Sequence, residues 1–335
     1  MLIEISRKNP FRSAQFVSEI IDRGRAVIET EAAALLHLAA SLDENFALAT
    51  EAILQTDGRV VVTGMGKSGH IGRKLAATLS STGTPAIFVH PAEAAHGDLG
   101  MLMVGDVLLV LSNSGATDEL NNILRHARAL SCTVIGISGK AESHVMESSD
   151  VRLLLPPARE ACPANIAPTT STTLMLALGD ALAIAIMGAQ GVSREKLKTL
   201  HPGGTIGSRL LPVCELMHAG EHLPLVSADM PMREVVVAIT QKSFGIVGVV
   251  DGDSNLVGAI TDGDLRRHVE QLLLSTAADV MTTDPRAVTE GTYVEDALGI
   301  MHAHKVSSLF VVRRSFPQIP IGIIHIRDLN RLGLI

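Results

Sequence analysis

Residues 59–74 read RVVVTGMGKSGHIGRK, an apolar run followed by a glycine-rich turn and a stretch with helical spacing. A continuous apolar run that ends in glycine is typical of a buried parallel strand that leads into a helix. Such a turn places backbone N–H groups at a helix N-terminus, where they bind phosphate. The unusual feature of this turn is Lys67 at its tip.

The order of these residues argues against two common phosphate loops. A Walker A loop needs its lysine after the last glycine, whereas Lys67 precedes Ser-Gly. Gly64, Gly66 and Gly69 fit a dinucleotide pattern loosely, but the strand that follows does not end in Asp or Glu, as that pattern requires. We therefore expect neither a Walker A site nor a nicotinamide site.

Apolar runs and helical segments continue to alternate up to about residue 160. The expected strands are AIFVH, DVLLVL, TVIGIS and VRLLLP, with helices over 68–83 and 117–130 between them. This pattern predicts an α/β fold with a doubly wound, flavodoxin-like parallel sheet, preceded by helices within 12–55. Ligands of such sheets bind outside the carboxyl ends of the strands. Four polar segments fall there: GMGKSG, HPAEAAHGD, SNSGATDE and REACPANIAPTTSTT.

Composition narrows the range of partners and compartments. A net charge of −7, no Trp and one Tyr argue against a nucleic-acid surface. Three widely spaced cysteines fit a reducing compartment. The N-terminus lacks the apolar region of a signal peptide, and the apolar stretch 172–189 carries Asp180 at its centre, where membrane insertion would cost about 2.5–3.5 kcal/mol. We expect a cytoplasmic protein without a membrane span.

The C-terminal part contains an internal repeat. Met217, Gly258 and Asp264 recur 64 residues later as methionine, glycine and aspartate. A constant offset over a whole unit indicates two copies of one small α+β domain. The predicted domains are residues 1–210, 211–273 and 274–335.

The segment SNSGATDE is the sharpest local signal of a binding site. It follows an apolar strand and precedes a helix, so hydroxyls and N–H groups meet there. This arrangement suits a phosphate monoester, although a serine-capped helix would give the same pattern. The candidate substrate-binding residues are Gly66, Ser68, His96, Ser112, Asn113, Ser114, Gly115 and Thr117.

Seven segments carry a family resemblance: GMGKSGHIGRK, HPAEAAHGDLG, SNSGATDE, EACP, APTTSTT, GDALA and HPGGTIG. In this order they resemble the sugar isomerase (SIS) domain of arabinose-5-phosphate isomerases. The duplicated unit with TDGDLRR and IRDLNR resembles the paired CBS domains of these enzymes. The resemblance implies interconversion of D-arabinose 5-phosphate and D-ribulose 5-phosphate for Kdo and lipopolysaccharide synthesis, in a homo-oligomer, by implication a tetramer.

The resemblance also implies the catalytic set Lys67, Glu119, Glu160 and His201. Aldose–ketose isomerisation needs a general base and a cation or donor for the enediolate oxygens, and these side chains supply both. Each has a plain alternative: phosphate binding for the lysine, a favourable helix terminus or an ion pair for the glutamates, and a turn for the histidine. The sequence leaves open which glutamate is the base and whether His201 acts in its own subunit or a neighbouring one.

We expect no cofactor and no required metal. His90 and His96 lie in a segment with Glu93 and Asp98, but the spacing matches no common zinc signature, and the chemistry needs no metal. Inhibitory binding of a metal at His90 is the form of metal binding that we expect.

In the repeats, Thr261 and Asp264 match the ribose-binding pattern of CBS domains, which implies a nucleotide or nucleotide-sugar effector. The second copy keeps Asp328 but has His325 in place of Ser or Thr, which argues against a nucleotide there. Both aspartates also fit simple helix caps.

Two other functions compete with the isomerase. One is a sugar-phosphate sensor that binds without turnover, and the other is an SIS isomerase of another sugar phosphate. A sensor needs only the phosphate loop, so the presence of all four catalytic residues favours an enzyme. The CBS pair and the HPGG segment argue against a hexose phosphate isomerase.

Overall fold

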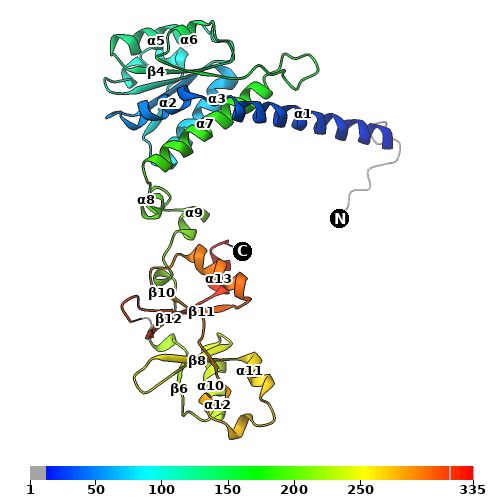
Figure 1. The fold of residues 1–335 in the computed structure, drawn as a ribbon, viewed down its shortest axis with the longest axis vertical. Helices are drawn as coiled ribbons and strands as arrows, with labels where there is room; N and C mark the ends of the chain where they lie inside the picture. The colour runs from blue at the N-terminus through cyan, green and yellow to red at the C-terminus, as the bar shows by residue number, and fades with distance from the viewer. Residues whose placement is uncertain (1–12, 317, 335) are drawn as a thin grey trace. The chain divides into compact units, whose positions relative to one another are not determined.

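The computed structural model describes residues 13–316 and 318–334, so most of the N-terminus examined for a signal peptide lies outside the described residues. The chain divides into two compact units, Met1–Ser193 and Arg194–Ile335, and each has its own hydrophobic core. Figure 1 labels their elements. The domain limits at 210/211 and 273/274 stay predictions.

The first unit is built on one parallel sheet, as predicted. Its five strands lie in the order β2-β1-β3-β4-β5, and every neighbouring pair is parallel. This is the flavodoxin-like order. The strands are β1 (Val60–Gly64), β2 (Ala86–Phe88), β3 (Val107–Leu111), β4 (Thr133–Ser138) and β5 (Val151–Leu154).

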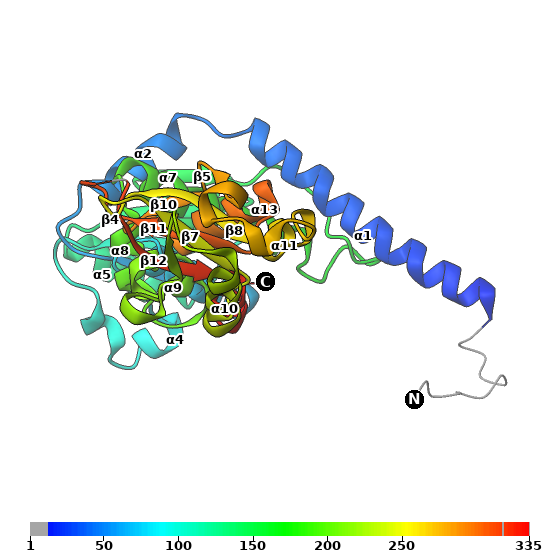
Figure 2. The same ribbon diagram turned by 90° about the horizontal axis from the view of Figure 1, so that it is seen from below.

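Within residues 13–193, seven α-helices flank the sheet or extend from it. They are α1 (Ala14–Ala40), α2 (Glu44–Leu54), α3 (Gly66–Ser81), α4 (Pro91–Ala94), α5 (Leu120–Ala129), α6 (His144–Glu147) and α7 (Thr170–Ala189). A short 3-10 helix, η2, spans Asp98–Met101. The helix α1 extends beyond the sheet in both views, and its buried residues, Ala34 and Leu38, lie in its C-terminal half (Figures 1 and 2).

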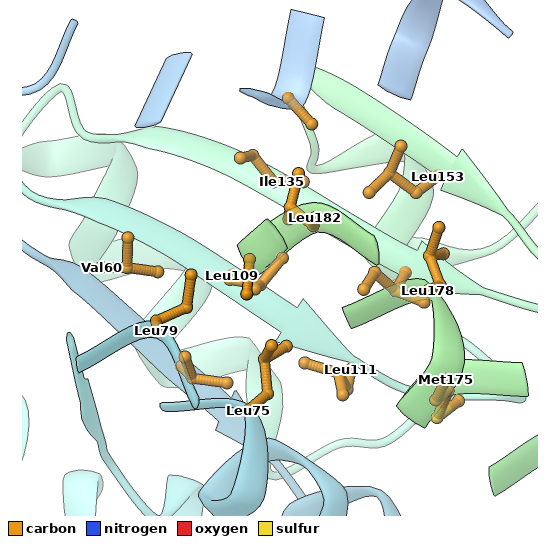
Figure 3. Packing of buried hydrophobic residues seen from close by; sticks show 14 of the residues in the cluster. Val60, Leu75, Leu79, Leu109, Leu111, Ile135, Leu153, Met175, Leu178 and Leu182 are labelled. Carbon is orange, nitrogen blue, oxygen red and sulfur yellow. The ribbon is translucent and has the colours of Figure 1, made fainter. Parts of the chain in front are cut away.

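Alternation along the strands gives the sheet two buried faces. Val60 and Val62 pack with α1, α2, α3 and α7, whereas Val61 packs with α5 and α6 on the other face. Successive side chains of a strand point to opposite faces, so a continuous apolar run is what a sheet covered on both sides requires. Figure 3 shows the first face, where Leu75 and Leu178 meet the strands.

The apolar stretch predicted as a core helix is α7. It is the one described helix that is long and apolar enough to cross a membrane by length and composition. Nine of its residues are buried, and Leu174, Met175 and Leu178 are part of the core. Asp180, which interrupts the apolar stretch, pairs with Lys74 of α3. In the structure α7 is thus a helix packed on the sheet.

The second unit contains two small sheets, β6-β7-β8-β9 and β10-β11-β12. In each, a parallel pair is followed by an antiparallel hairpin with a bulge at the same place. Its strands are β6 (Leu225–Ser227), β7 (Ile246–Val250), β8 (Leu256–Thr261), β9 (Thr282–Thr283), β10 (Ala287–Thr289), β11 (Ser308–Val312) and β12 (Pro320–His325). Its helices are α8 (Arg194–Leu200), α9 (Gly204–Arg209), α10 (Met232–Lys242), α11 (Asp262–Arg267), α12 (Ala277–Val280), α13 (Val294–His304) and α14 (Ile326–Arg331). The predicted α+β pair is confirmed.

The two repeats exchange their first segments. His218, near the start of the first copy, bridges to Ile323 of β12, and Thr282 of the second copy pairs with Ala259 of β8. The same offset of 64 relates the two contacts. The repeated glycines are needed because a methionine from the other repeat packs against each of them. A Cβ on Gly322 would lie 2.3 Å from the sulfur of Met217, and one on Gly258 would lie 2.4 Å from that of Met281.

Candidate active site

The strand order brings the two glycine-containing loops together. β1 lies between β2 and β3, so the order of strands reverses at the β1/β3 boundary. At the carboxyl ends, Gly64 lies opposite Leu111. Open α/β sheets bind their ligands at this kind of switch point. The loop with Lys67 and the loop 112–117 are therefore neighbours.

Glycines keep the turn after β1 tight. Gly66 has φ +57°, and a Cβ on Gly69 would lie 2.5 Å from the carbonyl oxygen of Gly64. The helix α3 starts at Gly66 without a side-chain cap, so its first N–H groups can bind a ligand. Lys67 is exposed and Ser68 half-buried in the first turn. A positive charge and N–H groups thus meet at the edge of the sheet.

The loop after β3 is closed by its own hydroxyls. Ser112 is buried, and its Oγ accepts a hydrogen bond from the Gly115 amide at 3.1 Å and lies 3.0 Å from Thr117 Oγ1. Asn113 and Ser114 are exposed at the tip. Ser112 therefore shapes the loop, while Asn113 and Ser114 stay accessible at its tip.

The helix after this loop begins later than the sequence predicted. The predicted start was Thr117, whereas α5 begins at Leu120. The hydroxyl contact of Thr117 with Ser112 and the left-handed backbone of Gly115 hold the chain in a turn up to Glu119. Glu119 is the exposed N-cap residue of α5, so its carboxylate stands at the positive end of the helix.

Glu160 lies at the N-terminus of α7. In Figure 3, Met175 of α7 lies toward Leu111, the last residue of β3, while Val60 lies at the other end of the sheet. The start of α7 therefore points to the carboxyl edge. There Glu160 Oε2 accepts hydrogen bonds from the Thr169 amide at 2.7 Å and its hydroxyl at 3.1 Å.

The second oxygen of this carboxylate is held by another hydroxyl. Glu160 Oε1 accepts a hydrogen bond of 2.5 Å from Ser171 Oγ, and the Ser171 amide lies 3.3 Å from Oε2. Burial disfavours the charged form, but the hydrogen bonds from Ser171 and Thr169 outweigh it and lower the pKa of the Glu160 carboxyl. Glu160 is thus a fixed anion at neutral pH.

The hydrogen bonds to the Glu160 carboxylate come from Thr169 and Ser171, not from the other predicted residues. His201 belongs to the second unit, where its Nδ1 is 2.9 Å from the carbonyl oxygen of Leu197. His96 is exposed after α4. His90 precedes α4, and its Nδ1 is buried without a hydrogen-bond partner. Over residues 13–316 and 318–334, no three His, Cys, Asp or Glu side chains are grouped so as to hold a metal ion.

In the second unit, a cavity of about 940 Å³ lies between the repeats. Thr261 and Asp264 line it and form a capping box at the start of α11, with Asp264 Oδ2 at 2.8 Å from the Thr261 amide. Arg267 also pairs with this carboxylate. Burial opposes ionisation, but these hydrogen bonds and the arginine lower the pKa of the Asp264 carboxyl. Helix capping, the alternative left open by the sequence, is present.

The related cleft of the second copy is different. It has a volume of about 530 Å³, and Asp328 caps α14 with His325 as its N-cap residue. Asp328 Oδ2 also lies 3.1 Å from His218 Nε2. Imidazoles of His218 and His325 thus occupy the positions that Thr282 and Thr261 hold in the first cleft.

Family models match most of the chain. The SIS domain model matches residues 53–185, and the CBS domain model matches residues 213–271 and 277–334. The chain also resembles the structure of c3406 from E. coli CFT073, which is described as a complex with arabinose 5-phosphate. That likeness has a TM-score of 0.54 at 36% identity and covers 55% of this chain and 98% of the other.

Full-length relatives extend this likeness over both units. The arabinose 5-phosphate isomerase KdsD of Escherichia coli K12 is 41% identical over 93% of this chain and 95% of its own length. The enzyme of the same name from Pseudomonas aeruginosa is 42% identical over 94% and 98%. The chain belongs to the arabinose 5-phosphate isomerase family. In this family member, Lys67, Glu119 and Glu160 fall within the SIS match, and His201 lies between it and the first CBS match.

In this arabinose 5-phosphate isomerase family member, two residues that bind the Glu160 carboxylate were not among the predicted site residues. Thr169 and Ser171 were noted only as part of a motif, yet they hold Glu160. The available signal was a cluster of hydroxyl residues just before a long apolar helix, downstream of a glutamate. Such residues favour helix N-termini, where they bind carboxylates or amides.

Proposed function

We propose that this protein is an aldose–ketose isomerase that interconverts D-arabinose 5-phosphate and D-ribulose 5-phosphate. Family membership over nearly the whole chain carries the proposal. The arrangement of an ammonium, a hydroxyl-rich loop and two glutamates at the carboxyl edge of the sheet supports it.

In the proposed reaction, the loop 112–117 and the N-terminus of α3 bind the phosphate. One of the glutamates Glu119 and Glu160 takes the C2 proton of the open-chain aldose, and this proton returns to C1. The hydroxyl proton of O2 passes to O1, so the reaction is balanced without an oxidant. Lys67 stabilises the enediolate oxygens, and His201 assists ring opening or proton transfer.

The direct test is turnover with a panel of pentose and hexose phosphates in deuterated water. We expect arabinose 5-phosphate to be converted and solvent deuterium to enter the sugar at C1 or C2. Glu119→Gln and Glu160→Gln keep the shape of the side chain, and at least one should slow turnover by about 10²–10⁴-fold. Binding without turnover of any sugar would favour the sensor, and conversion of another sugar phosphate alone would favour the other isomerase.

The biological setting that we propose is Kdo and lipopolysaccharide synthesis in the cytoplasm by a homotetramer. The family resemblance supports all three statements. Sedimentation of the full chain tests the oligomer, and a dimer or monomer at working concentration would contradict it. A deletion strain that keeps normal lipopolysaccharide would contradict the pathway.

We also propose that the cavity lined by Thr261 and Asp264 binds a nucleotide or nucleotide-sugar effector. One specific observation supports it: Ser308 Oγ is buried without a hydrogen-bond partner, and Ser308 lines this cavity. The cavity is also lined by cations that suit phosphate groups. They are Arg267, Arg286, Lys305 and Arg327.

Calorimetric titration of the full chain with AMP, ATP and a nucleotide-activated sugar acid tests this effector site. We expect binding by at least one of them, weakened in Ser308→Ala and in Arg286→Gln. Arg313→Gln is a matched control, since Arg313 does not line the cavity. Equal binding by all three variants would contradict the assignment.

A further inference from the structure

Thr169 and Ser171 hold both oxygens of the Glu160 carboxylate by hydrogen bonds. Oε2 accepts from the Thr169 amide, the Thr169 hydroxyl and the Ser171 amide, and Oε1 accepts from the Ser171 hydroxyl. A carboxylate has about four lone-pair directions on its two oxygens. Oε2 is therefore saturated, whereas Oε1 keeps one direction that none of these groups uses.

The hydroxyl of Thr169 has a fixed orientation. Its oxygen accepts a hydrogen bond of 2.8 Å from the Ala161 amide, so its proton is directed to Glu160. The backbone of Glu160 is tied in turn, because its amide donates to Asn165 Oδ1 at 2.7 Å. The loop between Glu160 and Thr169 is thus closed at both ends, and both the backbone and the carboxylate of Glu160 are held by hydrogen bonds.

We propose that Thr169 and Ser171 are positioning residues that hold Glu160 as an anion and direct the free side of Oε1 to the reacting sugar. This inference rests on the proposed function, because it gives Glu160 a role in that reaction. Within the described residues, hydroxyl and amide groups alone hold the carboxylate. Neutral donors favour the charged form of the Glu160 carboxyl. They do so without placing a cation beside the carboxylate, where it would compete with the substrate.

This arrangement has a chemical consequence for the reaction. A carboxylate held by these hydrogen bonds needs less reorganisation when the substrate binds, which is how pre-positioned groups lower a barrier. Loss of one donor would leave the anion less favoured and free to rotate. The catalytic step would then suffer more than substrate binding.

The test compares Ser171→Ala and Thr169→Val with the conservative changes Ser171→Thr and Thr169→Ser. Loss of one hydrogen bond to a charged group corresponds to about a 10- to 100-fold loss in kcat, with KM changed much less. The acid limb of the kcat/KM profile should move up by about one to two pH units, because the pKa of Glu160 rises. The conservative variants keep a hydroxyl and should recover most of the rate. Thr173→Ala, in the same helix and without a bond to Glu160, should behave as the parent.

A second readout does not depend on turnover. Carbon-13 NMR of the protein with labelled glutamate carboxyls, assigned with Glu160→Gln, reports the Glu160 titration directly. We expect its midpoint below the ordinary glutamate range in the parent and higher in Ser171→Ala. An unchanged midpoint, or an equal shift in Thr173→Ala, would overturn the proposal.

The two readouts separate this inference from the proposed function. A shifted midpoint in a protein that converts no sugar would refute the proposed function and the catalytic role but keep the contacts. Active Ser171→Ala and Thr169→Val variants with a parental pH profile would refute the positioning role and keep the isomerase.

Discussion

Gly115 shows how one backbone angle determines the shape of the loop 112–117. Its φ is +64°, and a Cβ at this position would lie 2.1 Å from Ser143 Oγ. Two independent costs follow, because an L-residue is strained in this conformation and the space is already filled. The loop can keep its shape only with glycine here.

We therefore expect Gly115→Ala to lower the free energy of unfolding by about 2–5 kcal/mol, measured by urea denaturation. Gly188→Ala is the matched control, since Gly188 lies in α7 with no heavy atom within 4 Å of the added Cβ. Alanine suits a helix better than glycine, so this control should gain about 0.5–1 kcal/mol. Equal effects at both positions would contradict the account.

Two backbone amides contact the thiol of Cys162. Its sulfur accepts hydrogen bonds from the amides of Ile166 and Ala167 at 3.0 and 3.1 Å, and these bonds lower the pKa of the thiol. Burial raises the pKa of the Cys132 thiol. The thiolate is the reactive form. Iodoacetamide should therefore modify Cys162 before the exposed Cys214 at pH 7, as measured by peptide mass spectrometry; faster labelling of Cys214 would refute this.

In the loop between β3 and α5, two serines have different environments and therefore different expected roles. Ser112 is buried and accepts from the Gly115 amide, whereas Ser114 is exposed at the tip. One side chain maintains the loop, and the other can reach a ligand. Their replacement should therefore have different consequences.

We expect Ser112→Ala to lower the free energy of unfolding by about 1–3 kcal/mol, because the Gly115 amide loses its partner. Ser114→Ala should leave stability unchanged and raise the apparent dissociation constant of arabinose 5-phosphate by about tenfold or more. Chemical denaturation and ligand titration of both variants measure this. The reverse pattern would show that Ser112 binds the phosphate.

The sheet could be predicted from the sequence because its signal is local: the continuous apolar run Val60, Val61 and Val62 is typical of a strand that is covered on both faces. The pair of small domains could be predicted because the repeat appears as a constant offset in the sequence. The start of α5 could not be predicted, since it depends on a hydroxyl contact across the loop between Ser112 and Thr117. The partners of Glu160 depend on how a loop of about ten residues closes, which no periodic pattern encodes.

At the scale of the whole molecule, the unit boundary separates the candidate catalytic residues. Arg194–Ile335 includes His201, and ion pairs within this unit hold α8 and α9. They join Arg194 to Asp296, Lys198 to Glu215 and Arg209 to Glu295. A cut after Ser193 therefore removes His201 together with helices that belong to the second unit.

We expect a fragment of residues 1–193 to fold and bind arabinose 5-phosphate, with turnover far below that of the full chain because His201 is absent. A fragment of residues 1–211 keeps His201 and should retain some turnover, although α8 and α9 lose their partners. Turnover and circular dichroism of both fragments measure this. Equal rates in the two fragments would exclude a role for His201.

The exchange of first segments predicts how the second unit folds. Val213 and Met217 pack in the core of the second copy, and Ala277 and Val280 in that of the first. Residues 194–273 and 274–335 should therefore be unfolded as separate fragments and fold when mixed, whereas 194–335 should unfold cooperatively by itself. Cooperative unfolding of either separate fragment would contradict this.

The same exchange restricts how such a module could have evolved. A gene that encoded one copy would have produced a chain whose first segment had no partner in its own fold. That ancestor had to work as a pair of identical chains, each completing the other. Tandem duplication then joined the two chains, which made the encounter independent of concentration. Once joined, the copies were free to differ, as they do where His218 and His325 stand at the positions of Thr282 and Thr261.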